Sequence, residues 1–129
     1  MEHVPIQSYR DLTAWRKSVE LVVEIYRVSR AMPEEERFGL VPQIRCAAVS
    51  IAANIAEGHG SSHKKTFLRH LTIARGSLME TECLLELAVR LEMVKEHDLG
   101  VARIWCDDVS RLLTSLIRAI SRSTGPRQH

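Results

Sequence analysis

Apolar residues recur every three or four positions along almost the whole chain, and this spacing constrains the fold more than any other feature. The first stripe consists of Leu12, Trp15, Val19, Val22 and Tyr26. It predicts a helix over about residues 11–31. No segment of useful length alternates apolar and polar residues with the period of two that a half-buried strand requires. We therefore expect an all-α chain.

Three more helices are predicted from the same spacing and from the residues that begin and end them. The second opens at Gly39 and Pro42, and it closes at Gly58, a residue that tolerates the positive φ common after a helix. The third starts at Ser61 or Ser62 as N-cap and runs to about 93, and the fourth covers about 96–122. Four helices with short connections favour an antiparallel up-down-up-down four-helix bundle.

The length and composition indicate one ordinary globular domain. The 129 residues divide into an N-terminal tail (1–8), the bundle (9–122) and a C-terminal tail (123–129). No apolar stretch approaches the roughly 20 residues of a membrane span, and the N-terminus lacks the pattern of a secretory signal. Cys46, Cys83 and Cys106 show no C-x-x-C spacing, which predicts reduced packing residues. We expect a cytoplasmic protein without membrane contact.

The middle of the second helix, between Arg45 and Glu57, has no charged residue on any of its faces. Between Arg45 and Glu57 its only polar residues are Ser50 and Asn54, and Cys46, Val49 and Ala53 fall opposite the core stripe. A helix that is apolar all round is usually buried all round, which a single bundle cannot provide. We therefore predict that Cys46, Val49 and Ala53 form a homo-oligomer interface. The alternative is that surface alanines are harmless, because alanine has the best helix propensity.

The net charge is only +2, but the charges are unevenly distributed. In an up-down-up-down bundle the start of helix one, the end of two, the start of three and the end of four share one pole. That pole collects Arg10, Arg16, Lys17, Lys64, Lys65, Arg69, Arg118, Arg122 and Arg127, against Asp11 and Glu57. The opposite pole holds Glu34, Glu35, Glu36, Glu92, Glu96 and Asp98. The basic pole predicts a nucleic-acid-binding surface, with an ordinary solvated face as the alternative.

The corner "NIAEGHGSSHKK" between helices two and three contains no recognisable chemical site. His59 and His63 flank a helix boundary and do not share a helical face, so no metal site is expected. The stretch is not a G-x-x-x-x-G-K-[ST] loop and follows no strand, which excludes a P-loop. No residue cluster assembles a nucleophile, a base and an orienting group. We expect neither enzymatic activity nor a cofactor.

Several stretches resemble a known family. "GLVPQIR", "SIAANIAEG" and "IARGSLME" resemble the bacterial four-helix-bundle family that includes the protein encoded in 23S ribosomal RNA intervening sequences, and the resemblance covers roughly residues 9–121. It implies a bundle that assembles as a ring, commonly a homopentamer. It also implies kinship with accessory proteins of diversity-generating retroelements, which bind nucleic acid and a reverse transcriptase. It implies no enzymatic activity.

The chain departs from the family pattern in several places. Cys46 stands where a second basic residue often follows Arg45, and Ser61 and Ser62 stand where arginines often follow the glycine turn. Thr66 replaces a usual acidic residue. We expect a non-enzymatic oligomer that binds RNA, DNA or a nucleoprotein partner such as a reverse transcriptase through its basic pole. The alternative is a purely structural or protein–protein assembly module.

Overall fold

The computed structural model describes residues 8–122, and the regular elements of this part of the chain are all helices. Four α-helices make up most of it: α1 (Thr13–Arg30), α2 (Leu40–Gly60), α3 (Lys64–Arg90) and α4 (Gly100–Arg122). Three short 3-10 helices lie before or between them: η1 (Tyr9–Asp11), η2 (Glu34–Glu36) and η3 (Glu96–Leu99). No strand occurs in the described range, so the all-α prediction is confirmed there.

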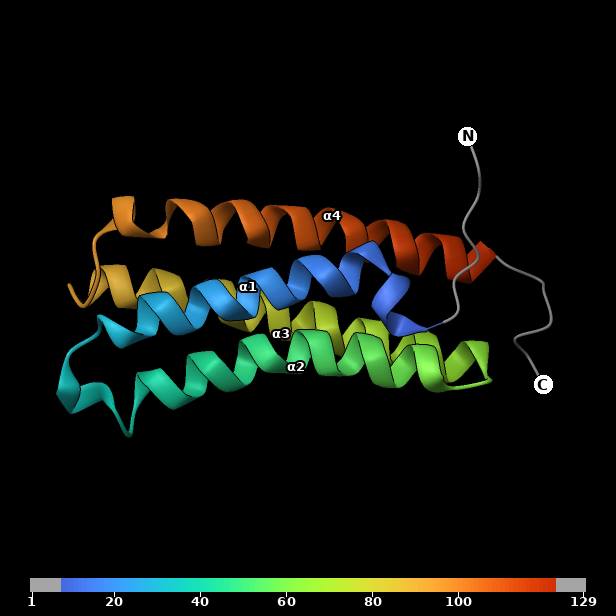
Figure 1. Ribbon diagram of the computed structural model, residues 1–129, viewed down its shortest axis with the longest axis horizontal. Coiled ribbons are helices and arrows are strands. Elements are labelled where there is room, and N and C mark those ends of the chain that lie inside the picture. The colour runs from blue at the N-terminus through green and yellow to red at the C-terminus, as the bar shows by residue number, and fades with distance from the viewer. Residues whose placement is uncertain (1–7, 123–129) are drawn as a thin grey trace.

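The four α-helices lie lengthwise beside one another, and the chain reverses direction at each connection (Figure 1). Each helix packs against two others, in the pairs α1–α2, α2–α3, α3–α4 and α1–α4. As a result, the start of α1, the end of α2, the start of α3 and the end of α4 lie toward the same end of the molecule (Figure 1). None of the helices within residues 8–122 combines the length and the apolar character needed to cross a membrane.

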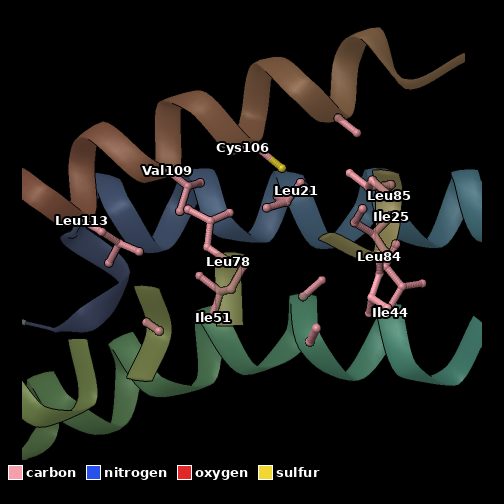
Figure 2. Close-up of a cluster of buried hydrophobic side chains, with 14 of the residues drawn as sticks. Leu21, Ile25, Ile44, Ile51, Leu78, Leu84, Leu85, Cys106, Val109 and Leu113 are labelled. Atoms are coloured by element: carbon pink, nitrogen blue, oxygen red, sulfur yellow. The ribbon is translucent and has the colours of Figure 1, made fainter. Parts of the chain in front are cut away.

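The core fills the space between the four helices with aliphatic side chains (Figure 2). Its fully buried members include Leu21, Ile25, Ile44, Ile51, Leu78, Leu85, Val109 and Leu113. Each such side chain contributes about 1.5–3 kcal/mol relative to an exposed position. Among the cysteines, Cys106 belongs to this core, but Cys46 and Cys83 are exposed. The prediction that all three are packing residues is therefore correct only for Cys106.

The end of α3 differs from the sequence prediction for a local reason. The helix stops at Arg90 rather than near 93, because Glu92 adopts a φ of 60°. Its N–H donates to the carbonyl of Val89 (2.9 Å), and the N–H of Met93 donates to that of Ala88 (2.8 Å). These are the two bonds of a Schellman motif, in which glycine normally occupies the position of Glu92. The predicted start of the fourth helix, 96–99, is the 3-10 helix η3.

Gly58 has a different role from the predicted one. It lies within α2 without a positive φ, and α2 continues to Gly60. An added Cβ would lie 2.8 Å from the Cβ of His70 and 2.9 Å from Cδ1 of Phe67. The glycine is therefore required by the close approach of α2 and α3, not by a helix end.

Candidate nucleic-acid interface

Eight of the nine predicted basic residues come from η1, the start of α1, the start of α3 and the end of α4, which lie toward the end of the bundle where α2 connects to α3 (Figure 1). The ninth, Arg127, lies outside the described residues. We call the surface at this end of the bundle the basic end; it comprises Arg10, Arg16, Lys64, Lys65, Arg69, Arg118 and Arg122. Arg10 comes from η1, Arg16 from the first turns of α1, and the remaining five from the start of α3 and the end of α4. Three helices and η1 thus contribute cations to one end of the molecule.

Lys17 does not join this group. Its ammonium lies 3.6 Å from the Asp108 carboxylate and 5.1 Å from the ring centroid of Trp105. Asp108 precedes Arg118 by about 15 Å along α4, at 1.5 Å per residue. Asp108 also pairs with Arg111, so the carboxylate is shared by two cations. These contacts within the chain account for a basic residue at position 17 on the α1–α4 seam.

The cations of the basic end are, in contrast, largely unbalanced. Arg16, Lys65, Arg69, Arg118 and Arg122 are exposed, and none forms an ion pair with an acidic side chain that the structure describes. The guanidinium of Arg10 lies over the Tyr9 ring at 5.3 Å. Unpaired cations on neighbouring helices produce a positive potential that attracts anionic ligands.

The start of α3 adds backbone donors to this charge. His63 occupies the N-cap position with extended backbone (φ −106°, ψ 127°) and makes no side-chain cap. The prediction of Ser61 or Ser62 as N-cap is therefore wrong, because Ser61 already follows α2 as its C-cap. A cavity of about 330 Å³ opens here, lined by His63, Lys64, Lys65 and Leu68. The backbone N–H groups and the dipole at the start of a helix favour anions in such a position.

The two corner histidines lie on separate elements. His59 is in the last turn of α2, and its ring packs edge-on against Phe67 with 5.9 Å between centroids. His63 precedes α3. Across the described range, 8–122, no three His, Cys, Asp or Glu side chains form a group that could hold a metal ion.

Two of the six acidic residues at the opposite end, Glu34 and Glu96, form ion pairs with arginines. Arg103 contacts Glu96 at 2.9 Å and Glu86 at 3.4 Å, and Arg37 lies 3.6 Å from Glu34. The hydrogen bond from Arg103 holds the pKa of Glu96 below its ordinary value. The two ends of the molecule therefore differ in charge, with exposed cations at the basic end and partly paired acids at the other.

The predicted oligomer-interface residues lie on the outer surface of α2. Cys46, Val49 and Ala53 are all exposed in the single chain. They line two cavities of about 640 and 320 Å³ that share Val49 and Ala53. The sequence interpretation missed the α1 side of this surface, to which Trp15, Val19, Val22 and Val23 belong. We call these α1 and α2 residues together the α1–α2 groove.

Comparison with protein families identifies the chain. Residues 10–115 match the family model described as "23S rRNA-intervening sequence protein". The chain belongs to this family. The intervening-sequence family match is supported by a crystal structure described as a protein with unknown function from the S23 ribosomal protein family of Bacteroides thetaiotaomicron. It is 29% identical, has a TM-score of 0.76, and the alignment covers 82% of this chain and 99% of that one. No curated protein matches the sequence.

In this member of the 23S rRNA-intervening sequence protein family, a polar seam joins α2 to α3. The amide nitrogen of Asn54 donates to the carbonyl and hydroxyl oxygens of Ser50 at 2.9 and 3.0 Å. Its Oδ1 therefore accepts from Nδ1 of His70 at 2.9 Å, which assigns the histidine proton to Nδ1. The Ser50 hydroxyl lies 2.8 Å from that of Ser77. A signal for the seam existed in the sequence, since Ser50 and Asn54 are the only polar residues in the charge-free run.

Proposed function

We propose that this protein is a non-enzymatic member of its family whose antiparallel four-helix bundle forms a homo-oligomeric ring and binds nucleic acid or a nucleoprotein partner. The binding surface is the basic end. The observation that carries the proposal is that Lys65, Arg69, Arg118 and Arg122 are exposed there without acidic partners among the described residues. The family description, which refers to a sequence within 23S rRNA, agrees with a nucleic-acid partner.

Two lysines of the basic end lie where the isolated helix disfavours positive charge. Lys64 and Lys65 are the first two residues of α3, where the helix dipole disfavours positive charge by about 0.3–1 kcal/mol each. Polar neutral residues would keep this corner soluble without that cost. A bound phosphate would offset this cost, because both the lysine charges and the positive end of the helix dipole would attract the phosphate.

In a ring, every subunit would present its own copy of the basic end to the same ligand. We propose a homopentamer that assembles through the α1–α2 groove, so that each subunit presents the same end and several weak contacts act together. Kinship with retroelement accessory proteins extends the proposal to a reverse transcriptase as the protein component of a nucleoprotein partner. We propose a cytoplasmic location for these contacts.

A salt titration tests the binding surface. Affinity for RNA or DNA should fall with salt, with a log–log slope of about −0.7 to −0.9 per phosphate contacted. The double variant Lys64→Glu/Lys65→Glu should weaken binding to all sequences alike and flatten that slope. The matched control Arg90→Glu/Lys95→Glu makes the same charge change at the opposite end and should leave the slope unchanged. Equal losses in both variants would show that only net charge matters and would remove the basic end as the site.

The α1–α2 groove favours a second candidate function, a purely structural or protein–protein assembly module. Val23 and Val49 are 60% and 42% exposed there, which is unusual for aliphatic residues so close together. Light scattering should report about five subunits, and Ala53→Glu should dissociate them while retaining helical circular dichroism. Ala119→Glu alters an exposed alanine of α4 outside the groove and should leave the assembly intact. An intact ring with no nucleic-acid binding at low salt would favour the assembly module.

A further inference from the structure

We propose that the ligand of the basic end is double-stranded nucleic acid, held by the phosphates of both strands, rather than an unpaired strand. This inference deepens the proposed function and rests on it. Two observations carry it: the aromatic rings near the basic end are engaged within the protein, and the unpaired cations form two pairs on neighbouring helices.

The aromatic rings determine whether bases can stack on the surface. Proteins that bind single strands gain about 1–3 kcal/mol per base from exposed rings. Here Tyr9 packs edge-on against Trp15 at 5.0 Å, and Phe67 is only 2% exposed. Among the Phe, Tyr and Trp rings of the described range, only Phe38 is strongly exposed, at 86%, and it lies in the α1–α2 connection at the opposite end. Apart from the small imidazole of His63, an unpaired strand would therefore find phosphate contacts at the basic end but no exposed ring on which its bases could stack.

The cations are arranged in two helical pairs. Lys65 and Arg69 are one turn apart on α3, and Arg118 and Arg122 are one turn apart on α4. Residues four apart on a helix are separated by about 6 Å. The two helices pack against each other, which places their axes about 8–10 Å apart. The result is two short rows of positive charge on rigid elements.

A duplex matches this arrangement better than a single strand does. It carries one negative charge per about 1.7 Å of length, against about 3.4 Å for one strand, and its phosphates follow both sides of each groove. Rigid rows of cations can contact rigid rows of phosphates without ordering either partner. A flexible strand must first lose conformational freedom, and here no stacking energy offsets that loss.

The expected preference can be calculated from counterion release. Four phosphate contacts per subunit give log–log salt slopes of about −3.6 for a duplex and −2.8 for a single strand. The difference of about 0.8 corresponds to roughly tenfold tighter duplex binding at about 0.05 M salt, if the two forms bind equally at about 1 M. Equal binding at high salt is expected because neither form gains stacking contacts.

Fluorescence anisotropy with the full chain tests the inference. The probes are a short mixed-sequence DNA duplex, the matching RNA duplex, and each strand alone, chosen to lack self-pairing. Both duplexes should bind about tenfold tighter than their strands at low salt, with the steeper slope. The variant Lys65→Gln/Arg69→Gln should reduce the magnitude of the duplex slope by about 1.8, whereas Arg90→Gln, an exposed arginine paired with Glu86, should not change it.

The possible results separate this inference from the proposed function. Single strands that bind as tightly as the duplexes would overturn the duplex assignment and leave nucleic-acid binding in place. Absence of binding to all four probes at low salt would overturn both. An unchanged slope in Lys65→Gln/Arg69→Gln would show that the α3 row does not hold the duplex.

Discussion

Replacing Gly58 with alanine should destabilise the bundle, although alanine is the better helix former. The new Cβ would lie 2.8 Å from the Cβ of His70 and 2.9 Å from Cδ1 of Phe67. The Cβ of His70 is fixed to the α3 backbone, so relief requires the two helices to separate. Overpacking of this kind costs about 1–3 kcal/mol, and the rigid neighbour places this case near 3. Alanine returns about 1 kcal/mol of helix propensity, which leaves a net loss of about 2 kcal/mol.

Urea unfolding followed by far-UV circular dichroism measures this loss. All samples must have the same protein concentration, since assembly couples stability to concentration. With a slope near 2 kcal/mol per molar urea, the midpoint of Gly58→Ala should fall by about 1 M. Gly76→Ala is the matched control, because its added Cβ in the middle of α3 meets nothing within 4 Å. It should gain up to about 1 kcal/mol. A Gly58→Ala protein as stable as the wild type would refute the close-approach argument.

Three further predictions concern the helix end, the thiols and one buried carboxyl. Glu92→Gly should stabilise the protein by about 0.5–1 kcal/mol in the same urea assay, because glycine adopts the φ of 60° without steric cost; a destabilised variant would contradict this. Burial raises the pKa of the Cys106 thiol to about 12, so a thiol reagent at mildly alkaline pH should leave it unmodified until the protein unfolds. Cys83 should react at once. Cys46 should react only in the Ala53→Glu variant, because the proposed ring covers it. Rapid reaction of all three thiols in the native protein would contradict the burial of Cys106 and the proposed covering of Cys46. Burial also raises the pKa of Glu82, so its carboxylate costs stability as the pH rises above about 4.5. Glu82→Gln should therefore raise the melting temperature at pH 7, and the difference should shrink toward pH 4; a constant difference would exclude the ionisation as its cause.

Helical spacing predicted the helices, but it located the buried face better in α2 than in α1. In α2, Ile44, Ala48, Ile51 and Ile55 recur at this spacing and are all 0% exposed. In the first predicted stripe, Trp15, Val19, Val22 and Tyr26 are only half-buried, because the core face of α1 is the neighbouring row that contains Leu21 and Ile25. Spacing predicts a helix because each element has one buried face, whose residues recur with period 3.6 whatever its partner. It carries no information about which other helix covers the face.

Helix ends and glycines were less predictable, because their causes are not local. Gly58 could serve a helix end or a close approach, and only the position of α3 decides between them. Glu92 occupies a position that glycine usually marks, so nothing in its residue type indicates the end of α3. Lys17 was assigned to the pole from its place near the start of α1, and its contact with Asp108 depends on how α4 packs against α1, which the sequence does not state.

A comparison of Lys17 with the other cations shows which basic residues are accounted for by contacts within one chain and which are not. Lys17 has an acidic partner and an aromatic ring beneath it, so packing within one chain explains a basic residue there. Lys65, Arg69 and Arg118 are exposed without such partners in the described part of the chain, and neutral polar residues would satisfy the bundle equally well. The same reasoning applies to Val23 in the α1–α2 groove, which is 60% exposed although its helix already has a buried face. In both places the proposed contacts outside the single chain would account for the residue type: an anion at the basic end and an apolar surface at the groove.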